Sequence, residues 1–128
     1  MEKLRINNIV RHYLGHKHAY GEYCCNLMFM ECYEPDVYEQ MVGQYTTAKE
    51  GALLAKELTG CMSVAEFLEQ SDDYEPRDFL QAGHGDIIVD GVSVSIIIGN
   101  HAIGLSDGVF KMLPLEGVKG LDIYRKVN

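Results

Sequence analysis

The sequence predicts an α+β protein, with helices in its first half and an antiparallel sheet in its second half. Apolar residues recur at helical spacing up to the Gly83-His84-Gly85-Asp86 segment, after which short apolar runs are separated by turn dipeptides. Helices and strands that are segregated in this way are typical of the α+β class. A length of 128 residues is enough for one core, so residues 1–128 are expected to form a single domain.

Two helices are expected before Pro35. Apolar residues recur at helical spacing over residues 4–14, and Gly15 supplies a C-terminal stop. The second helix begins at Cys24 or Cys25 and ends ahead of Pro35. Because it is apolar on most sides, we expect it to be the buried central helix.

Two further helices begin at capping-box sequences. Thr47 is followed three residues later by Glu50, and Ser63 by Glu66, and apolar residues follow in both cases. The acidic stretch 71–78, which contains a proline, is interpreted as a solvated loop.

An antiparallel meander of about five strands is expected after the helices. The dipeptides Asp90-Gly91 and Asp107-Gly108 indicate hairpins, and Asp-Gly in a two-residue loop favours a type I′ turn. The expected strands cover residues 87–89, 92–98, 102–105, 109–113 and 121–127.

Composition excludes several classes of function. With 19 acidic and 11 basic residues the formal charge is −8, which argues against nucleic acid as a partner. No apolar run approaches the ~20 residues of a membrane span, and the N-terminus lacks the pattern of a signal peptide. We therefore expect synthesis in a cytoplasm and no membrane insertion.

No cofactor or metal is predicted. The four cysteines lack the paired spacing of a zinc site and are interpreted as reduced thiols. His12 and His16 have metal-ligand spacing on one helix face, with His18 nearby, but no third ligand stands at a defined offset. Solvent-facing histidines are the favoured interpretation.

Three motifs share their order with a known group of enzymes. The run Tyr20–Cys25 opens the central helix, Gly85-Asp86 opens the first strand of the meander, and the second strand ends at Gly99. In this order they resemble the papain-like, NlpC-type cell-wall peptidases. The resemblance implies a papain-like fold with Cys25 at the nucleophile position and Cys24 where Asp is usual. A thiol at a helix N-terminus is also favoured as the thiolate.

A closer resemblance is to a family of small phage proteins related to this group and often encoded among tail genes. The segment 43–47 fits that family's Gly-x-Tyr-x-Thr motif, and Gly60 separates the two following helices. Leu113-Pro114-Leu115 and Ile123-Tyr124-Arg125 are similar to its tail, with Tyr124 in place of Trp. This resemblance covers nearly the whole chain.

The catalytic base of the peptidases is missing at its expected place. Alignment on Gly99 puts Ser93 at the position of the histidine and Leu105 near the third position. A serine hydroxyl has no suitable pKa near neutrality, and leucine cannot orient an imidazole. Two other histidines, His84 and His101, remain as candidate bases.

The resemblance therefore implies a non-enzymatic bacteriophage virion component, a tail or tail-tip protein that contacts other virion proteins. Assembly as a homo-oligomer and contact with cell-wall peptide are left open. The alternative is an active cysteine peptidase or amidase that acts on peptidoglycan peptide, with Cys25 as nucleophile and His101 or His84 as base.

Overall fold

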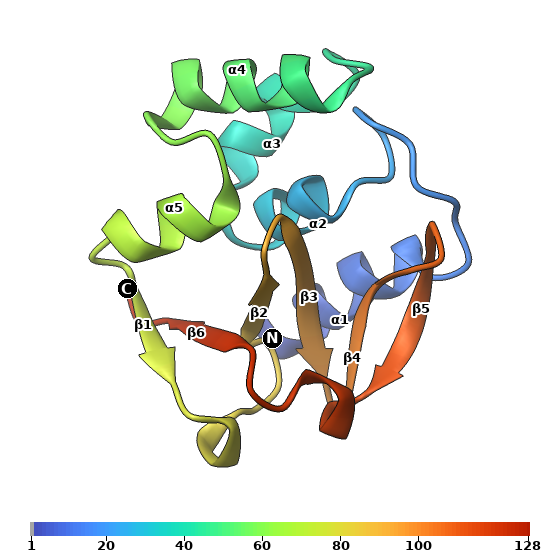
Figure 1. Ribbon diagram of the computed structural model, residues 1–128, viewed down its shortest axis with the longest axis vertical. Coiled ribbons are helices and arrows are strands. Elements are labelled where there is room, and N and C mark those ends of the chain that lie inside the picture. Colours follow the sequence, from blue (N-terminus) through green and yellow to red (C-terminus); the bar gives the residue numbers. More distant parts are fainter. Residues whose placement is uncertain (1) are drawn as a thin grey trace.

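The computed structural model describes residues 2–128 and has helices first and strands second (Figure 1). The α-helices are α1 (Glu2–Tyr13), α2 (Cys25–Tyr33), α3 (Pro35–Met41), α4 (Ala48–Thr59) and α5 (Val64–Gln70). The strands are β1 (Tyr74–Arg77), β2 (Ile87–Asp90), β3 (Ser93–Ile98), β4 (His101–Ser106), β5 (Val109–Pro114) and β6 (Asp122–Lys126). Two 3₁₀-helices, η1 (Phe79–Gln81) and η2 (Leu115–Val118), complete the elements. None of the helices described within residues 2–128 is long and apolar enough to cross a membrane.

The α+β class is confirmed, but the sheet has six strands where about five were expected. Its order is β1-β6-β2-β3-β4-β5, and every neighbouring pair is antiparallel. The additional strand, β1, lies inside the acidic stretch 71–78 that the sequence analysis had interpreted as a loop. Pro76 has no backbone N–H, so it could not donate a hydrogen bond in a central strand. Strand β1 is an edge strand paired only with β6, and proline is tolerated there.

A second difference lies after the central helix. The sequence predicted that α2 ends before Pro35, which it does, but a further helix, α3, begins at that proline. Proline suits the first position of a helix because its missing N–H would have no partner there. Both predicted caps are present: the side chains of Thr47 and Ser63 accept hydrogen bonds from the backbone N–H groups three residues later.

The predicted hairpins form, but one has another turn type. Asp90 pairs with Ser93, so the central residues of the first turn are Gly91 and Val92, and only Gly91 has a positive φ. This pattern fits a type II′ turn and not the type I′ turn expected from Asp90-Gly91. In the β4–β5 turn both Asp107 and Gly108 have positive φ, as a type I′ turn requires.

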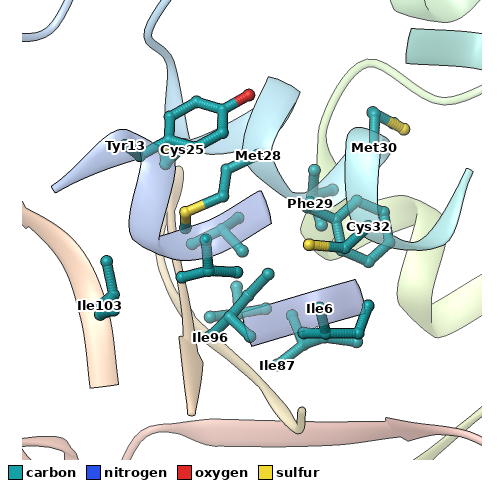
Figure 2. Packing of buried hydrophobic residues seen from close by; sticks show 14 of the residues in the cluster. Ile6, Tyr13, Cys25, Met28, Phe29, Met30, Cys32, Ile87, Ile96 and Ile103 are labelled. Atoms are coloured by element: carbon teal, nitrogen blue, oxygen red, sulfur yellow. The ribbon is translucent and has the colours of Figure 1, made fainter. Parts of the chain in front are cut away.

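The main core lies between one face of the sheet and the helices α1, α2 and α5. Figure 2 shows α2 contributing Cys25, Met28 and Phe29, which pack toward Ile96 and Ile103 of the sheet. A second cluster joins the other side of α2 to α3 and α4. Helix α2 is thus buried on both sides, as predicted. The opposite face of the sheet is covered by residues of η1, η2 and the segments beside them.

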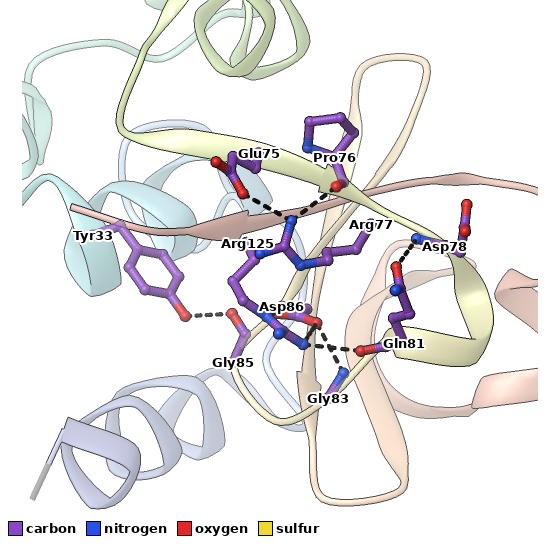
Figure 3. Close-up of polar contacts among 10 residues, drawn as sticks. All are labelled: Tyr33, Glu75, Pro76, Arg77, Asp78, Gln81, Gly83, Gly85, Asp86 and Arg125. Carbon is purple, nitrogen blue, oxygen red and sulfur yellow. Dashed lines mark hydrogen bonds and ion pairs between the residues drawn. The ribbon is translucent and has the colours of Figure 1, made fainter.

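The Gly85-Asp86 motif is a structural anchor (Figure 3). The Asp86 carboxylate is 2% exposed and accepts from Arg125 in β6 and from the backbone N–H of Gly83. The Tyr33 hydroxyl at the end of α2 donates to the Gly85 carbonyl. Two motifs far apart in the sequence, Gly85-Asp86 and the Arg125 tail, therefore fix β2, β6 and α2 relative to one another.

Candidate functional site

The N-terminus of α2 borders a cavity of about 480 Å³. The opposite walls are one face of α4 and the first turn of α5, and the tips of the β2–β3 and β4–β5 hairpins close one end. Along α4 the lining residues are small and lie on one side of the helix: Ala48, Gly51, Ala52, Ala55 and Thr59. These small side chains leave the space open, and its volume lies within the usual range of small-molecule sites.

Cys25 is the first residue of α2, as the nucleophile position requires, but its thiol is poorly placed for attack. The residue is 5% exposed, and its sulfur lies 4.0 Å from the carbonyl oxygen of Val92. Interaction with the Cys24 sulfur and burial raise the pKa of Cys25 well above its ordinary value. Cys25 is therefore a protonated thiol near neutral pH.

The strand position that faces Cys25 is held by valine, and not by Ser93. Along β3, Val94 and Ile96 pack in the same cluster as Cys25, while Ile97 packs in the cluster on the other face. Because side chains alternate across a strand, Ser93 shares the face of Ile97. The sequence alignment that put Ser93 at the base position is thus corrected: Ser93 borders the cavity at its rim but is directed to the far side of the sheet.

The two candidate bases are not brought to Cys25. His101 pairs with Ile98 at the far end of β3, five residues along the strand from Ser93, a distance of roughly 16 Å. His84 lies at that same end, where its Nδ1 accepts a hydrogen bond from the Gly99 backbone N–H. Both imidazoles lie at the end of the sheet opposite to Cys24 and Cys25.

His18 is the histidine that lines the cavity, and the sequence analysis did not select it as a base. Its backbone N–H donates to the Gly108 carbonyl, and its ring packs edge-on against Tyr20 with centroids 4.4 Å apart. These contacts fix its loop to the β4–β5 turn. No motif spacing indicated this placement, since it depends on the loop after α1 folding back across the sheet.

Cys24 is the cysteine of this pair whose pKa is lowered. It is the N-cap residue of α2 and makes no capping hydrogen bond of regular geometry. Contact with the Cys25 thiol, then the backbone N–H groups of Asn26 and Leu27 and the Tyr45 hydroxyl, outweigh burial and lower the pKa of Cys24 to about 5. The environment of Cys24 therefore favours its thiolate form, whereas that of Cys25 favours the protonated thiol.

Tyr45, which the sequence analysis did not select, is fixed by two close approaches to glycine. A side-chain carbon at Gly21 would lie 2.1 Å from the Tyr45 carbonyl oxygen, and one at Gly51 would lie 2.7 Å from the Tyr45 ring. Both glycines leave room that alanine would fill. The Gly-x-Tyr-x-Thr motif over residues 43–47 contains this tyrosine. The sequence therefore showed the motif, but it did not show that Tyr45 interacts with Cys24.

The two histidines predicted on one face of the first helix are not both part of it, because α1 contains His12 but ends at Tyr13, before His16. Both rings pack against other rings. His12 and His16 have ring centroids 6.1 Å apart, and His16 stacks on Tyr23 at 3.9 Å. Across residues 2–128 no group of three or more His, Cys, Asp or Glu side chains is arranged to hold a metal ion.

Comparison with known families matches residues 2–121 to the family described as "Domain of unknown function (DUF6950)". The chain belongs to this family. The DUF6950 match spans α1 through the 3₁₀-helix η2, so it includes both cysteines, Tyr45 and all walls of the cavity. Neither the curated proteins nor the solved structures contain a match to the chain.

Proposed function

We propose that this chain is a non-enzymatic component of a bacteriophage virion, a tail or tail-tip protein whose papain-like, NlpC-type domain has lost its catalytic base. The observation that carries the proposal is the environment of Cys25. Its sulfur faces the Val92 carbonyl and the buried Val94, and both candidate imidazoles, His84 and His101, lie at the other end of the sheet.

Turnover by a cysteine hydrolase needs a thiolate and a base that exchanges protons with it. Cys25 has neither, because its pKa is raised and the strand beside it supplies valine. The order of elements, with a cysteine-bearing central helix before an antiparallel sheet, supports an NlpC-type ancestry. A fold retained without its base is best explained by a role in contacts with other virion proteins or with further copies of this chain.

The test combines location and activity. Mass spectrometry of purified particles of the phage that encodes the chain is expected to detect it as a stoichiometric component. The purified protein is expected to release no peptide from peptidoglycan. Cys25→Ala should leave infectivity unchanged, with Cys32→Ala, a substitution in the same helix but outside the cavity, as the matched control. Hydrolysis that disappears in Cys25→Ala but persists in Cys32→Ala would overturn the proposal.

The alternative, a cysteine peptidase or amidase acting through Cys25, is favoured by one observation: His18 lines the same cavity as Cys25. It requires rapid labelling of Cys25 by iodoacetamide near neutral pH. Tandem mass spectrometry separates an adduct on Cys25 from one on the adjacent Cys24. We expect Cys25 to remain unlabelled in the folded protein, and loss of Cys25 labelling on His18→Ala would support the enzyme instead.

A further inference from the structure

A second cavity, of about 620 Å³, lies beside His84, at the end of the sheet opposite to the cysteine pair. Its walls come from the first turn of α1, the junction of α2 and α3, the residues just before β2, and the end of β6 with the residues after it. None of the described residues that line it also lines the cavity beside Cys25. Its volume lies within the usual range of small-molecule sites.

Hydrogen bonds between distant segments hold the walls together. Arg5 in α1 donates from Nη2 to the Cys32 carbonyl in α2. His84 Nδ1 accepts from the Gly99 N–H, so the ring proton is assigned to Nε2, which lies 3.3 Å from the Lys3 carbonyl oxygen. The first turn of α1, which carries two basic side chains, is thereby held against the rest of the wall.

Basic side chains outnumber acidic ones in this wall, although the whole chain has a formal charge of −8. The charged side chains are four basic and two acidic ones: Lys3, Arg5, Arg125, Lys126, Glu2 and Asp86. The α-carboxylate of Asn128 reduces the positive excess of the lining without cancelling it. Lys126 is engaged by the Tyr33 carbonyl and by Glu34, which leaves Lys3, Arg5 and Arg125 for a ligand.

The acidic groups of the wall are already paired, whereas several of its donors are not. Asp86 accepts from Arg125 on both carboxylate oxygens (Figure 3), and Glu2 accepts from Arg5. No other described residue forms a hydrogen bond or ion pair with the Lys3 ammonium, with Arg5 Nη1 or with Arg125 Nη1. The Arg5 and Arg125 side chains are 43% and 39% exposed, so a ligand can reach them. The wall therefore offers N–H donors to a ligand and requires acceptors from it.

The spare donors select an oxyanion with several oxygens. A phosphate monoester carries a charge of about −1.5 to −2 at neutral pH and has three acceptor oxygens. Guanidinium groups bind such oxygens through planar, charge-assisted hydrogen bonds. The positive end of the α1 dipole acts in the same direction, because the first turn of this 12-residue helix is part of the wall. Ile6, Pro35 and the Tyr33 ring supply apolar surface for the rest of the ligand.

We propose that this cavity binds a small organic phosphate monoester. The phosphate group accepts from the Lys3, Arg5 and Arg125 side chains, and the apolar body of the ligand lies against Ile6 and Pro35. The negative charge of the whole chain opposes the approach of an anion, but at physiological salt this repulsion is screened beyond about 8 Å. The binding needs neither catalysis nor a virion, so the inference is independent of the proposed function.

The test uses phenyl phosphate, benzyl alcohol and inorganic phosphate as separate probes, each titrated into the isotope-labelled wild-type protein and followed by NMR chemical shifts. We expect phenyl phosphate to bind about tenfold more tightly than either other probe, since each of them lacks one half of the ligand. The largest shifts are expected at the amides of Lys3, His84 and Arg125. Equal affinity for benzyl alcohol or for inorganic phosphate, shifts confined to other segments, or no binding of phenyl phosphate would each overturn the inference.

Two substitutions locate the phosphate group, and both remove one positive charge from an exposed part of the wall. Lys3→Gln and Arg5→Gln are each expected to weaken phenyl phosphate binding about tenfold. The matched control is Arg11→Gln, which removes the same charge from the last turn of α1, outside the cavity, and is expected to leave the affinity unchanged. Equal weakening in all three variants would show attraction to the overall charge alone. Unchanged affinity in both Lys3→Gln and Arg5→Gln would place the ligand elsewhere, and either result contradicts the proposal.

Discussion

Arg125 donates from Nε and Nη2 to the two carboxylate oxygens of Asp86, with both distances at 2.9 Å. The same guanidinium donates to the Gln81 carbonyl, and its pKa is raised by the aspartate (Figure 3). Asp86 is buried, so its negative charge is stabilised by this ion pair and by the hydrogen bond from the Gly83 N–H. The tail motif thus stabilises the motif that opens β2.

Arg125→Met is expected to lower the free energy of unfolding by about 2 to 3 kcal/mol, because it leaves a buried carboxylate without its main partner. The matched control is Arg77→Met on the neighbouring β1, whose pair with the exposed Glu75 is expected to contribute about 0 to 1 kcal/mol. Urea denaturation of the two variants gives the comparison. Equal losses would show that the Asp86 pair contributes no more than a surface ion pair.

Gly21 and Gly43 illustrate two different reasons why a position in the chain requires glycine. Both have positive φ, but only Gly21 has a close neighbour, the Tyr45 carbonyl, while a side-chain carbon at Gly43 meets nothing within 4 Å. Gly43→Ala is expected to cost about 1 to 2 kcal/mol from backbone conformation alone. Gly21→Ala should cost about 1 to 3 kcal/mol more because of the clash. If thermal unfolding shows the same loss for both, the packing of Tyr45 against Gly21 is wrong.

The Cys24 thiolate predicts a pH dependence of stability with a definite sign. Its pKa falls from 9.0 in the reference state to about 5 in the fold, so between these values the unfolded chain binds a proton that the folded chain lacks. The contribution of Cys24 is fully present above about pH 9 and is lost as the pH falls through about 5. The difference in unfolding free energy between wild type and Cys24→Ser should therefore increase from about pH 5 to 9. Thiolate absorbance near 240 nm offers an independent check, and a flat difference would contradict the assignment.

The buried Tyr13 and Tyr74 and the half-buried Tyr33 predict the opposite behaviour at high pH. Burial raises the pKa values of Tyr13, Tyr33 and Tyr74, and hydrogen bonds to Glu31 and Glu34 add to this for Tyr13 and Tyr74. The unfolded state loses these protons above about pH 10 while the folded state keeps them, so stability should fall as the pH rises further. Absorbance at 295 nm should show part of the tyrosinate signal appearing only when circular dichroism reports unfolding. A native titration identical to that in urea would rule this out.

Local patterns predicted most of the fold. The capped helices at Thr47 and Ser63 and the hairpin at Asp107-Gly108 depend on nearby residues, and they form as expected. Strand β1 could not be predicted because its partner, β6, lies about fifty residues later in the chain. Helix α3 was missed because the proline that ended one helix also began the next.

The site was less predictable than the fold. The run containing Cys25 located the central helix and its N-terminal position, which the structure shares. Which side of β3 faces this thiol depends on the strand pleat. A shift of one residue in the sequence alignment therefore put Ser93 where Val94 lies. The pKa of Cys24 is lowered mainly by contact with Cys25 and then by the backbone N–H groups of Asn26 and Leu27, and Tyr45 from another loop adds the smallest contribution.

The place of β6 has a consequence for how the chain reaches its folded state. In the sheet, β6 lies between β1 and β2, although both of these precede it in the sequence. Strand β1 therefore has no partner, and β2 can form only its ladder with β3, until β6 has emerged from the ribosome. We expect the helical half to collapse first and the sheet to close in a late, rate-limiting step, since pairing between distant segments is slow.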